Sequence, residues 1–409
     1  MYGLKQYIDR GSLFANNQLR PGNKKLATLM FYATDLCDSA CKHCLIWAKR
    51  PVKHLPFEKI KEVMESKCVT KNTMVGLEGG EFLLHPQAMD IMQWLKAEHP
   101  NFDLLSNCLK PEGTIEAVKK HTPKHLYISL DGTKDTYKYM RGKDGHDDVL
   151  KVIEACHKDV PISTMFTLSP YNSFDDMEYV ADVCKRYGVD MRVGVYNDIA
   201  FFDTVEKAHE TEVGEQKNEE LLKFKDVREA KANGLLSKNE ELAVLQKQDL
   251  HEAKHDPTKL NAIKDFKERI PQKIKEFQEN YDFLVLYDEW RNKNTKLNCY
   301  SILDSLVVHP DGNVPICQNL DTRIGNIYEN TLDEIFNGKD TQAIQKEHVH
   351  NCNQCWINFH RKYDVIMYRS MEKFFGKYVT SKMLGYYQWE EDAKSTYKQF
   401  MQKMENTYK

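Results

Sequence analysis

Apolar residues recur with two different periods along the first half of the chain. Six short apolar runs, rich in β-branched, leucine and aromatic residues, are separated by segments with the spacing of amphipathic helices. We expect strands at 26–34, 73–80, 102–107, 125–132, 162–169 and 189–196, and helices at 57–67, 86–98, 112–121, 146–157 and 174–187. Such alternation is typical of βα units and a parallel sheet. It fits a doubly wound sheet or an incomplete barrel, and periodicity does not decide between them.

The stretch 201–280 differs in composition from the segments on either side. Of its 80 residues, 18 are acidic and 15 are basic, so that 33 of 80, about 41%, are charged, against 29% for the whole chain. This density of charge is typical of a solvated, mostly helical excursion. We expect an exposed helical insertion, which acts either as a cover or as a surface that binds substrate or a partner.

A third region begins near residue 281 and mixes short apolar runs with turns. The stretch 305–317 holds two apolar runs around Asp311-Gly312, which predicts a β-hairpin. A turn and a short helix follow, and a Cys-x-x-Cys pair then opens a long helical segment. These patterns divide the chain into an N-terminal extension (1–25), an α/β domain (26–200), the charged helical insertion (201–280), a small α+β domain (281–378) and a helical tail (379–409).

Composition narrows the classes of protein. Hydrophobic residues make up 41% of the chain, enough for a buried core, and the formal net charge is -3. No strongly basic face is indicated, which argues against nucleic acid as the main partner. There is no apolar run of about 18 residues and no signal-peptide pattern, so we expect a cytoplasmic protein without a membrane span. In that reducing compartment, the 11 cysteines are more often metal ligands or catalysts than disulfides.

Three cysteines directly follow the first predicted strand. Cys37, Cys41 and Cys44 are spaced Cys-x3-Cys-x2-Cys, at the strand edge where parallel α/β folds build their active sites. Three thiolates can hold three irons of a four-iron cluster and leave the fourth iron open for a substrate or cofactor. The alternative is a zinc site with His43 as a fourth ligand, although zinc sites favour Cys-x2-Cys spacings.

This cysteine spacing resembles the signature of the radical S-adenosylmethionine (SAM) superfamily, and other segments match in order. The stretch "LEGGEF" resembles the glycine-glycine-glutamate motif after strand two, "LLSNC" the end of strand three, and "ISLDG" with a later Arg-Gly the segment after strand four. The resemblance covers about 26–197 and implies an α/β fold with a partial (β/α)6 TIM-type barrel. It also implies that SAM is cleaved reductively to a 5′-deoxyadenosyl radical, which takes a hydrogen atom from an unactivated carbon.

The third region is similar to the family's C-terminal auxiliary-cluster domains, called SPASM and the shorter Twitch. The matching cysteines are Cys299, Cys317, Cys352 and Cys355, with Gly312 between the first two. No cysteine follows Cys355, which departs from the full SPASM pattern and indicates one auxiliary 4Fe-4S cluster, as in Twitch enzymes. A structural zinc held by the same four cysteines is the alternative.

The resemblance assigns roles to individual residues. Cys37, Cys41 and Cys44 would ligate the 4Fe-4S cluster that cleaves SAM. Contacts with SAM would come from His43, Gly79, Gly80, Glu81, Ser106, Asn107, Ser129, Asp131, Arg141 and Tyr196. Among these, the glycines would let the backbone approach the SAM amino group, and Arg141 would pair with the SAM carboxylate; for the polar residues, capping of strand ends is the alternative. Cys108, next to Asn107, is a candidate catalytic hydrogen-atom donor at the barrel mouth.

The function expected from these parts is net oxidation of a polar small molecule, such as a sugar or cyclitol, with the auxiliary cluster accepting an electron. The electron donor to the enzyme would be of the flavodoxin or ferredoxin type. Modification of a ribosomal peptide by crosslinking or epimerisation is the alternative, although the 36 residues before Cys37 are fewer than a separate leader-binding domain needs. A non-catalytic iron–sulfur electron carrier belongs to another class, and it has no need of six βα units.

Overall fold

The computed structural model of the chain describes residues 4–44, 46–49, 51–169, 171–196, 263, 265–277, 279–292, 297–319, 322–352 and 355–384. Most of the expected charged insertion and most of the expected C-terminal tail lie outside these residues. Among the described residues, no helix is both long enough and apolar enough to span a membrane.

A seven-stranded parallel sheet, curved into a half-barrel, forms the centre of the molecule. Its order is β6-β5-β4-β3-β2-β1-β7. The strands are β1 (Thr28–Tyr32), β2 (Met74–Glu78), β3 (Phe102–Ser106), β4 (His125–Ser129), β5 (Ile162–Leu168), β6 (Asp190–Val195) and β7 (Ser305–Val308). The six strands expected from the apolar runs are all present, and the partial-barrel fold is confirmed.

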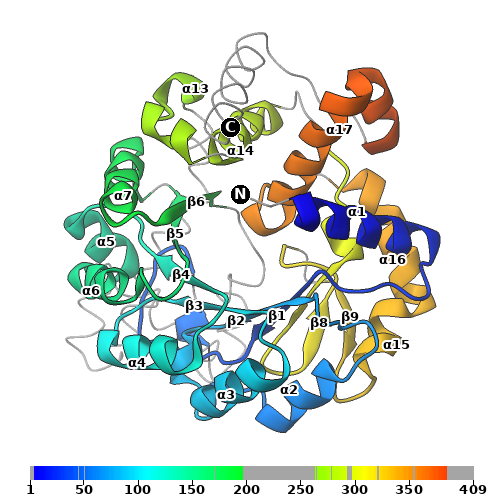
Figure 1. Cartoon of the computed structure of the whole chain (residues 1–409), viewed down its shortest axis with the longest axis horizontal. Helices are drawn as coiled ribbons and strands as arrows, with labels where there is room; N and C mark the ends of the chain where they lie inside the picture. The colour runs from blue at the N-terminus through cyan, green and yellow to red at the C-terminus, as the bar shows by residue number, and fades with distance from the viewer. Residues whose placement is uncertain are drawn as a thin grey trace, which may run out of the picture.

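Helices cover the outer side of the sheet. The short helical turns η1 (Ile46–Ala48) and η2 (Phe82–Leu84) follow β1 and β2 along the chain, and η1 lines the inner cavity. The outer helices are α2 (Phe57–Met64), α3 (Ala88–Glu98), α4 (Pro111–His121), α5 (Lys134–Arg141), α6 (His146–Cys156) and α7 (Phe174–Tyr187). Figure 1 shows them following one another outside the arc of strands. Local signals set their ends: a capping box between Ser173 and Asp176 begins α7, and Gly188 at φ +66° ends it.

The predicted hairpin at 305–317 is only half right. The turn at Asp311-Gly312 forms, with Gly312 at φ +80°. However, β7 pairs with β1 in parallel, Val307 lying opposite Met30, and β8 (Asn313–Pro315) pairs antiparallel with β9 (Arg323–Asn326) instead. Without β7, β1 would be an unpaired edge of the barrel sheet.

The remaining helices lie on the open side of the half-barrel. They are α1 (Leu4–Leu19), α13 (Phe266–Arg269), α14 (Glu279–Arg291), α15 (Leu332–Asn337), α16 (Lys339–Asn351) and α17 (Asn358–Leu384), with the turns η3 (Gln272–Glu276) and η4 (Ser301–Leu303). Figure 1 shows α1 beside α16 and α17. The guanidinium of Arg10 lies 4.0 Å from the centre of the Tyr363 ring, which joins α1 to α17.

Candidate active site

A cavity of about 1300 Å³ runs along the inner face of the half-barrel. Cys37, Cys41 and Cys44 line it at the carboxyl end of the strands, and residues of α1 and α17 line it on the open side. The structure therefore brings the three predicted cluster ligands together at the edge where βα folds place their active sites.

The end of α5 holds the cysteine loop by its backbone. Ala40 N donates to Arg141 O at 3.0 Å, and Lys42 N donates to Met140 O at 2.9 Å. Gly142 follows at φ +67°, and a Cβ atom there would lie 2.6 Å from Ala40 O. The Arg-Gly pair noted in the sequence therefore has a structural reason: glycine ends the helix and leaves room for the loop.

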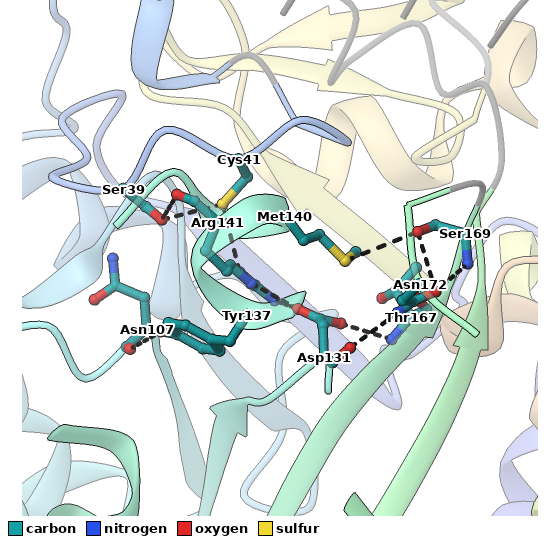
Figure 2. A network of polar contacts seen from close by, with 10 residues as sticks. All are labelled: Ser39, Cys41, Asn107, Asp131, Tyr137, Met140, Arg141, Thr167, Ser169 and Asn172. Carbon is teal, nitrogen blue, oxygen red and sulfur yellow. Dashed lines mark hydrogen bonds and ion pairs between the residues drawn. The ribbon is translucent and has the colours of Figure 1, made fainter. Parts of the chain in front are cut away.

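Arg141 makes its ion pair within the protein (Figure 2). Its Nε donates to Asp131 Oδ2 at 2.6 Å, and its Nη1 lies 3.6 Å from Cys41 Sγ. Burial opposes its charge, but Asp131 and Cys41 outweigh burial and raise the pKa of Arg141 above its ordinary value. The other oxygen of Asp131 accepts from Thr167 N at 2.9 Å. Arg141 thus lies between Asp131 and Cys41, and it also lines the cavity, so its pairing with the SAM carboxylate stays a prediction.

Asp131 is a predicted SAM contact that the structure places behind the cavity wall. It is fully buried and does not line the cavity, because Arg141 and Thr167 use both carboxylate oxygens. The ion pair spans 10 residues of sequence, with α5 folding back onto the end of β4. Asp131 thus holds Arg141, which itself lines the cavity, from behind the cavity wall.

Cys108 is the second residue placed differently from expectation. Its thiol is fully buried in the hydrophobic core, does not line the cavity, and lies 3.9 Å from Ser106 O. Its backbone adopts φ +60°, a left-handed conformation that turns the side chain away from the mouth. Burial raises the pKa of Cys108 well above its usual range. The structure therefore places the Cys108 thiol in the core and not at the barrel mouth, and its role as a hydrogen-atom donor stays a prediction.

The glycine pair after β2 packs against the start of the cysteine loop. A Cβ on Gly79, at φ +142°, would lie 2.5 Å from Thr34 O, and one on Gly80 would lie 2.3 Å from Leu36 O. Both glycines also line the cavity. Close backbone packing within the protein is thus sufficient to require these glycines, in addition to the approach to SAM that the sequence suggested.

Glu81, Ser106 and Asn107 form a hydrogen-bonded group at the cavity wall. Asn107 N donates to Glu81 Oε2 at 2.7 Å, and Asn107 Nδ2 donates to Asp38 Oδ1, next to Cys37, at 2.9 Å. Burial raises the pKa of Glu81 to about 7. Together these contacts tie the ends of β2 and β3 to the cysteine loop.

The residues at this end fit the cofactors that the cysteine pattern implies. His43 lines the cavity, and its buried Nδ1 has no hydrogen-bond partner among the described residues. Burial lowers the pKa of His43 to about 4, so the ring is neutral and can bond a polar edge such as that of adenine. Ser129 and Tyr196 also line the cavity, as expected. Burial raises the pKa of Cys44 to about 12, and a bound metal would reverse that preference.

Charged and aromatic side chains inside the barrel were not predicted. They are Tyr32, Glu78, Asp103, His125, Tyr127 and Arg192, all of which line the cavity. The guanidinium of Arg192 lies 4.6 Å from the centre of the Tyr127 ring, and the His125 ring stacks on Tyr127 at 4.5 Å. The sequence could have indicated these residues, because strands of a parallel sheet that are buried on both faces are usually apolar throughout. A carboxylate or guanidinium within such a run indicates an inner cavity.

The four predicted auxiliary cysteines also come together. Cys299, Cys317, Cys352 and Cys355 line one small cavity of about 10 Å³, with His360 and Arg361 beside them. Burial raises the pKa values of Cys299 and Cys355. This donor set fits an iron–sulfur cluster with four thiolate ligands. Within the described ranges, no group of three or more His, Cys, Asp or Glu side chains has the geometry to hold a single metal ion.

Comparison with protein families identifies the chain. Residues 31–184 match the model of the radical SAM superfamily, and residues 299–356 match that of SPASM, an iron–sulfur cluster-binding domain. The chain belongs to the radical SAM superfamily. This radical SAM enzyme uses SAM with a 4Fe-4S cluster, and its SPASM domain carries auxiliary iron–sulfur chemistry.

Solved structures share the fold of this radical SAM enzyme. The crystal structure of Streptococcus suis SuiB has a TM-score of 0.50 and 13% identity, with 85% of this chain and 74% of that chain covered. Native anSMEcpe with bound AdoMet and the Cp18Cys peptide has a TM-score of 0.46 and 14% identity, with 87% and 99% covered. No curated protein matches the sequence.

Proposed function

We propose that this radical SAM enzyme oxidises a polar small molecule, such as a sugar or cyclitol, held inside the half-barrel. When bound, SAM and its cluster supply abstraction of a hydrogen atom from carbon, and the auxiliary cluster supplies a one-electron acceptor. Net oxidation requires that the acceptor lie beside the substrate. The observation that carries the proposal is the placement of the auxiliary site against the main cavity.

Residues next to the auxiliary cysteines line the substrate cavity. Gln318, which follows Cys317, and Ile357, two residues after Cys355, both line it. Gln318 Nε2 donates to the hydroxyl of Tyr32, inside the barrel, at 2.8 Å. The auxiliary site is thus connected to the cavity wall through one side chain.

The cavity wall suits a substrate rich in hydroxyl groups. Asp103 and Arg192 offer an acceptor and donors, and burial raises the pKa of Asp103 to about 6. Buried polar groups favour polar neighbours, so such a wall suits hydroxyl groups better than an apolar substrate. Phe359 of α17 and the aromatic ring of Tyr363 close the open side and limit entry of water.

The test begins with anaerobic reconstitution of the full chain with iron and sulfide, followed by SAM, dithionite and a panel of cyclitols and amino sugars. We expect 5′-deoxyadenosine together with a product that has lost two hydrogens and gained a carbonyl. Replacing dithionite by a reduced flavodoxin or ferredoxin tests the proposed electron donor. Full clusters without 5′-deoxyadenosine would indicate an electron carrier and overturn the proposal.

A ribosomal peptide is the second candidate substrate. It is favoured by the cavity volume of about 1300 Å³, which exceeds the ~300–1000 Å³ usual for small-ligand pockets, although SAM takes part of the space. Incubation with short peptides encoded beside the gene, read by mass spectrometry, separates the two candidates. A crosslinked or epimerised peptide without any carbonyl product would replace the small-molecule proposal.

A further inference from the structure

Glu78 occupies a distinctive position in the barrel. It is the last residue of β2, directly before Gly79, and it lines the cavity at the end where the cluster cysteines lie. The hydroxyl of Tyr32 on β1 donates to its carboxylate, and the ionisable neighbour on β3 is Asp103. None of the roles described above uses this carboxylate.

Hydrogen bonds connect Glu78 to the auxiliary site. Tyr32 accepts from Gln318 Nε2 at 2.8 Å, and Gln318 N donates to His360 Nε2 at 3.4 Å. His360 Nδ1 then lies 2.6 Å from Ser301 Oγ, which in turn lies 3.9 Å from Cys299 Sγ. Five contacts therefore run from the cavity to a predicted auxiliary ligand.

The direction of each bond follows from its donor. The backbone N–H of Gln318 makes Nε2 of His360 an acceptor, so Nδ1 carries the hydrogen and donates to Ser301. Burial lowers the pKa of His360 to about 3, so the ring is neutral. The side-chain amide and the backbone N–H of Gln318 both donate outward. This chain of contacts therefore fixes the positions of its side chains and transfers no proton between the cavity and the auxiliary site.

We propose that Glu78 is the base that takes the hydroxyl proton of the substrate during its oxidation, and that Tyr32 and Gln318 hold this base against the electron acceptor. The inference rests on the proposed function. The carbon–hydrogen bond breaks first, and its hydrogen atom goes to the SAM-derived carbon radical. The oxygen–hydrogen bond then breaks, its proton goes to Glu78, one electron goes to the auxiliary iron–sulfur cluster, and the carbon–oxygen double bond forms.

Other carboxylates near the cysteine end are already engaged. Glu81 accepts from the backbone nitrogens of Asn107 and Leu83, and Asp131 is held by Arg141 and Thr167. Asp103 pairs in register with Gly76, two positions before Glu78 along β2, so it lies deeper in the barrel than Glu78. Burial raises the pKa of Glu78 to about 7, which leaves it able to accept and release a proton near neutral pH.

The first test needs no substrate and no turnover. Infrared spectra of reconstituted holoenzyme are recorded across a pH series, and those of Glu78→Gln are subtracted to isolate the Glu78 carboxyl. We expect the carboxyl to titrate near neutral pH. Tyr32→Phe should raise its midpoint, because the Tyr32 hydroxyl stabilises the carboxylate. No titration between pH 5 and 9, or a midpoint unchanged in Tyr32→Phe, would overturn the inference.

The second test uses whichever alcohol the substrate panel identifies. Glu78→Gln should lower carbonyl formation by ~10²–10⁴-fold, the usual contribution of a general base, while 5′-deoxyadenosine release continues. Glu78→Asp should restore part of the rate. Glu112→Gln, which removes an exposed carboxylate on α4, is the control and should match wild type. The wild-type rate should fall as pH drops below about 7, and Glu78→Gln should lose this dependence.

The outcomes separate the two proposals. Carbonyl formation at the wild-type rate in Glu78→Gln would contradict the assignment of Glu78 as the base, but it would not contradict the oxidation proposal. If Glu78→Gln lost both 5′-deoxyadenosine release and product, Glu78 would serve SAM cleavage, and its assignment as the base would also be contradicted. The absence of any carbonyl product from wild type instead removes the proposed function.

Discussion

Cys41 and Cys299 each lie near a buried arginine that is paired with an aspartate, but the two sites are enclosed differently. Arg141 pairs with Asp131 beside Cys41, and Arg361 pairs with Asp364 near Cys299. The first cysteine opens onto a cavity of about 1300 Å³, and the second onto one of about 10 Å³. A buried cation offsets thiolate charge in both places, whereas only the first site has room for a cofactor and a substrate.

The two sites also differ in how they are assembled. The three barrel cysteines lie within eight residues of one loop, from Cys37 to Cys44, which the end of α5 holds by backbone hydrogen bonds. The auxiliary cysteines come from three separate segments, before η4, after β8 and between α16 and α17. Arg361 gathers part of this site by donating to the carbonyls of Leu297 and Cys355. One local loop therefore builds the site of Cys37, Cys41 and Cys44, called the open site here because it faces the large cavity. Long-range packing builds the site of the four auxiliary cysteines, called the closed site.

The largest expected effect is at the open site. Cys37→Ala removes one of three ligands from a cluster that has no fourth thiolate to spare, so SAM cleavage should be abolished. The measurement is 5′-deoxyadenosine released by the reconstituted, dithionite-reduced enzyme. Cys156→Ala, which changes a buried core thiol on α6, is the control and should retain cleavage. Cleavage in Cys37→Ala at the control level would contradict the ligand assignment.

At the closed site, Cys355→Ala should separate the two activities. We expect SAM cleavage to continue and the carbonyl product to be lost, because the electron acceptor is damaged while the barrel cluster is intact. Iron content and 5′-deoxyadenosine are measured alongside the product. Continued turnover to oxidised product would show that the auxiliary site does not accept the electron.

The arginines provide a test of stability. Arg141→Ala leaves Asp131 as an unpaired buried charge and should cost about 3–5 kcal/mol of unfolding free energy. Lys134→Ala, which breaks an exposed pair with Asp147, should cost much less, because exposed ion pairs contribute little to stability. Urea denaturation measures both, and Arg361→Ala extends the comparison to the closed site. Equal costs for Arg141→Ala and Lys134→Ala would contradict the role of the buried pair.

Two glycines with nearly the same backbone form a matched pair. Gly142 has φ +67° and lies against Ala40, whereas Gly188 has φ +66° and nothing within 4 Å of its would-be Cβ. Gly188→Ala should cost about 1–2 kcal/mol from backbone strain alone. Gly142→Ala should cost about 1–3 kcal/mol more and lower the iron bound at the open site, because the loop must move. Urea denaturation and iron analysis check both variants. Identical iron contents would argue against the role of α5 in holding the cysteine loop.

A further expected effect concerns pH. The folded pKa of Glu78, about 7, lies above the usual 4.5, so the folded state binds more protons between these values. The contribution of Glu78 to stability is therefore present below about pH 4.5 and is lost as pH rises through 7. Wild type should lose about 2–3 kcal/mol relative to Glu78→Gln between about pH 5 and pH 8. Parallel urea curves at each pH give the difference, and a constant difference would contradict the raised pKa.

The sequence predicted contiguous features well and spatial pairing less well. Six strands followed from apolar runs, and the loop from Cys37 to Cys44 followed from spacing. The pairing of β7 with β1 did not follow, because paired residues such as Thr28 and Ser305 are 277 positions apart and no local pattern records the match. Helix α5 was missed because its sequence, KDTYKYMR, has little apolar content.

The sequence also did not predict how polar side chains are oriented. Ser-x-Asp-Gly and Arg-Gly were visible as motifs, but their pairing as Asp131 with Arg141 depends on how α5 folds back. Cys108 follows a cavity residue, and yet its positive φ directs the thiol into the core. The position of Glu78, a carboxylate at the end of a buried strand and directly before the glycine pair, could have indicated a cavity residue.

The position of β7 has a consequence for dissecting the enzyme. Because this strand comes from the far end of the chain and completes the sheet next to β1, the two halves of the molecule share one continuous hydrogen-bonded surface. A fragment truncated after β6 would present β1 as a bare edge, inviting association with other chains. The barrel and the SPASM domain are thus joined through one sheet, and they are best expressed and mutated together.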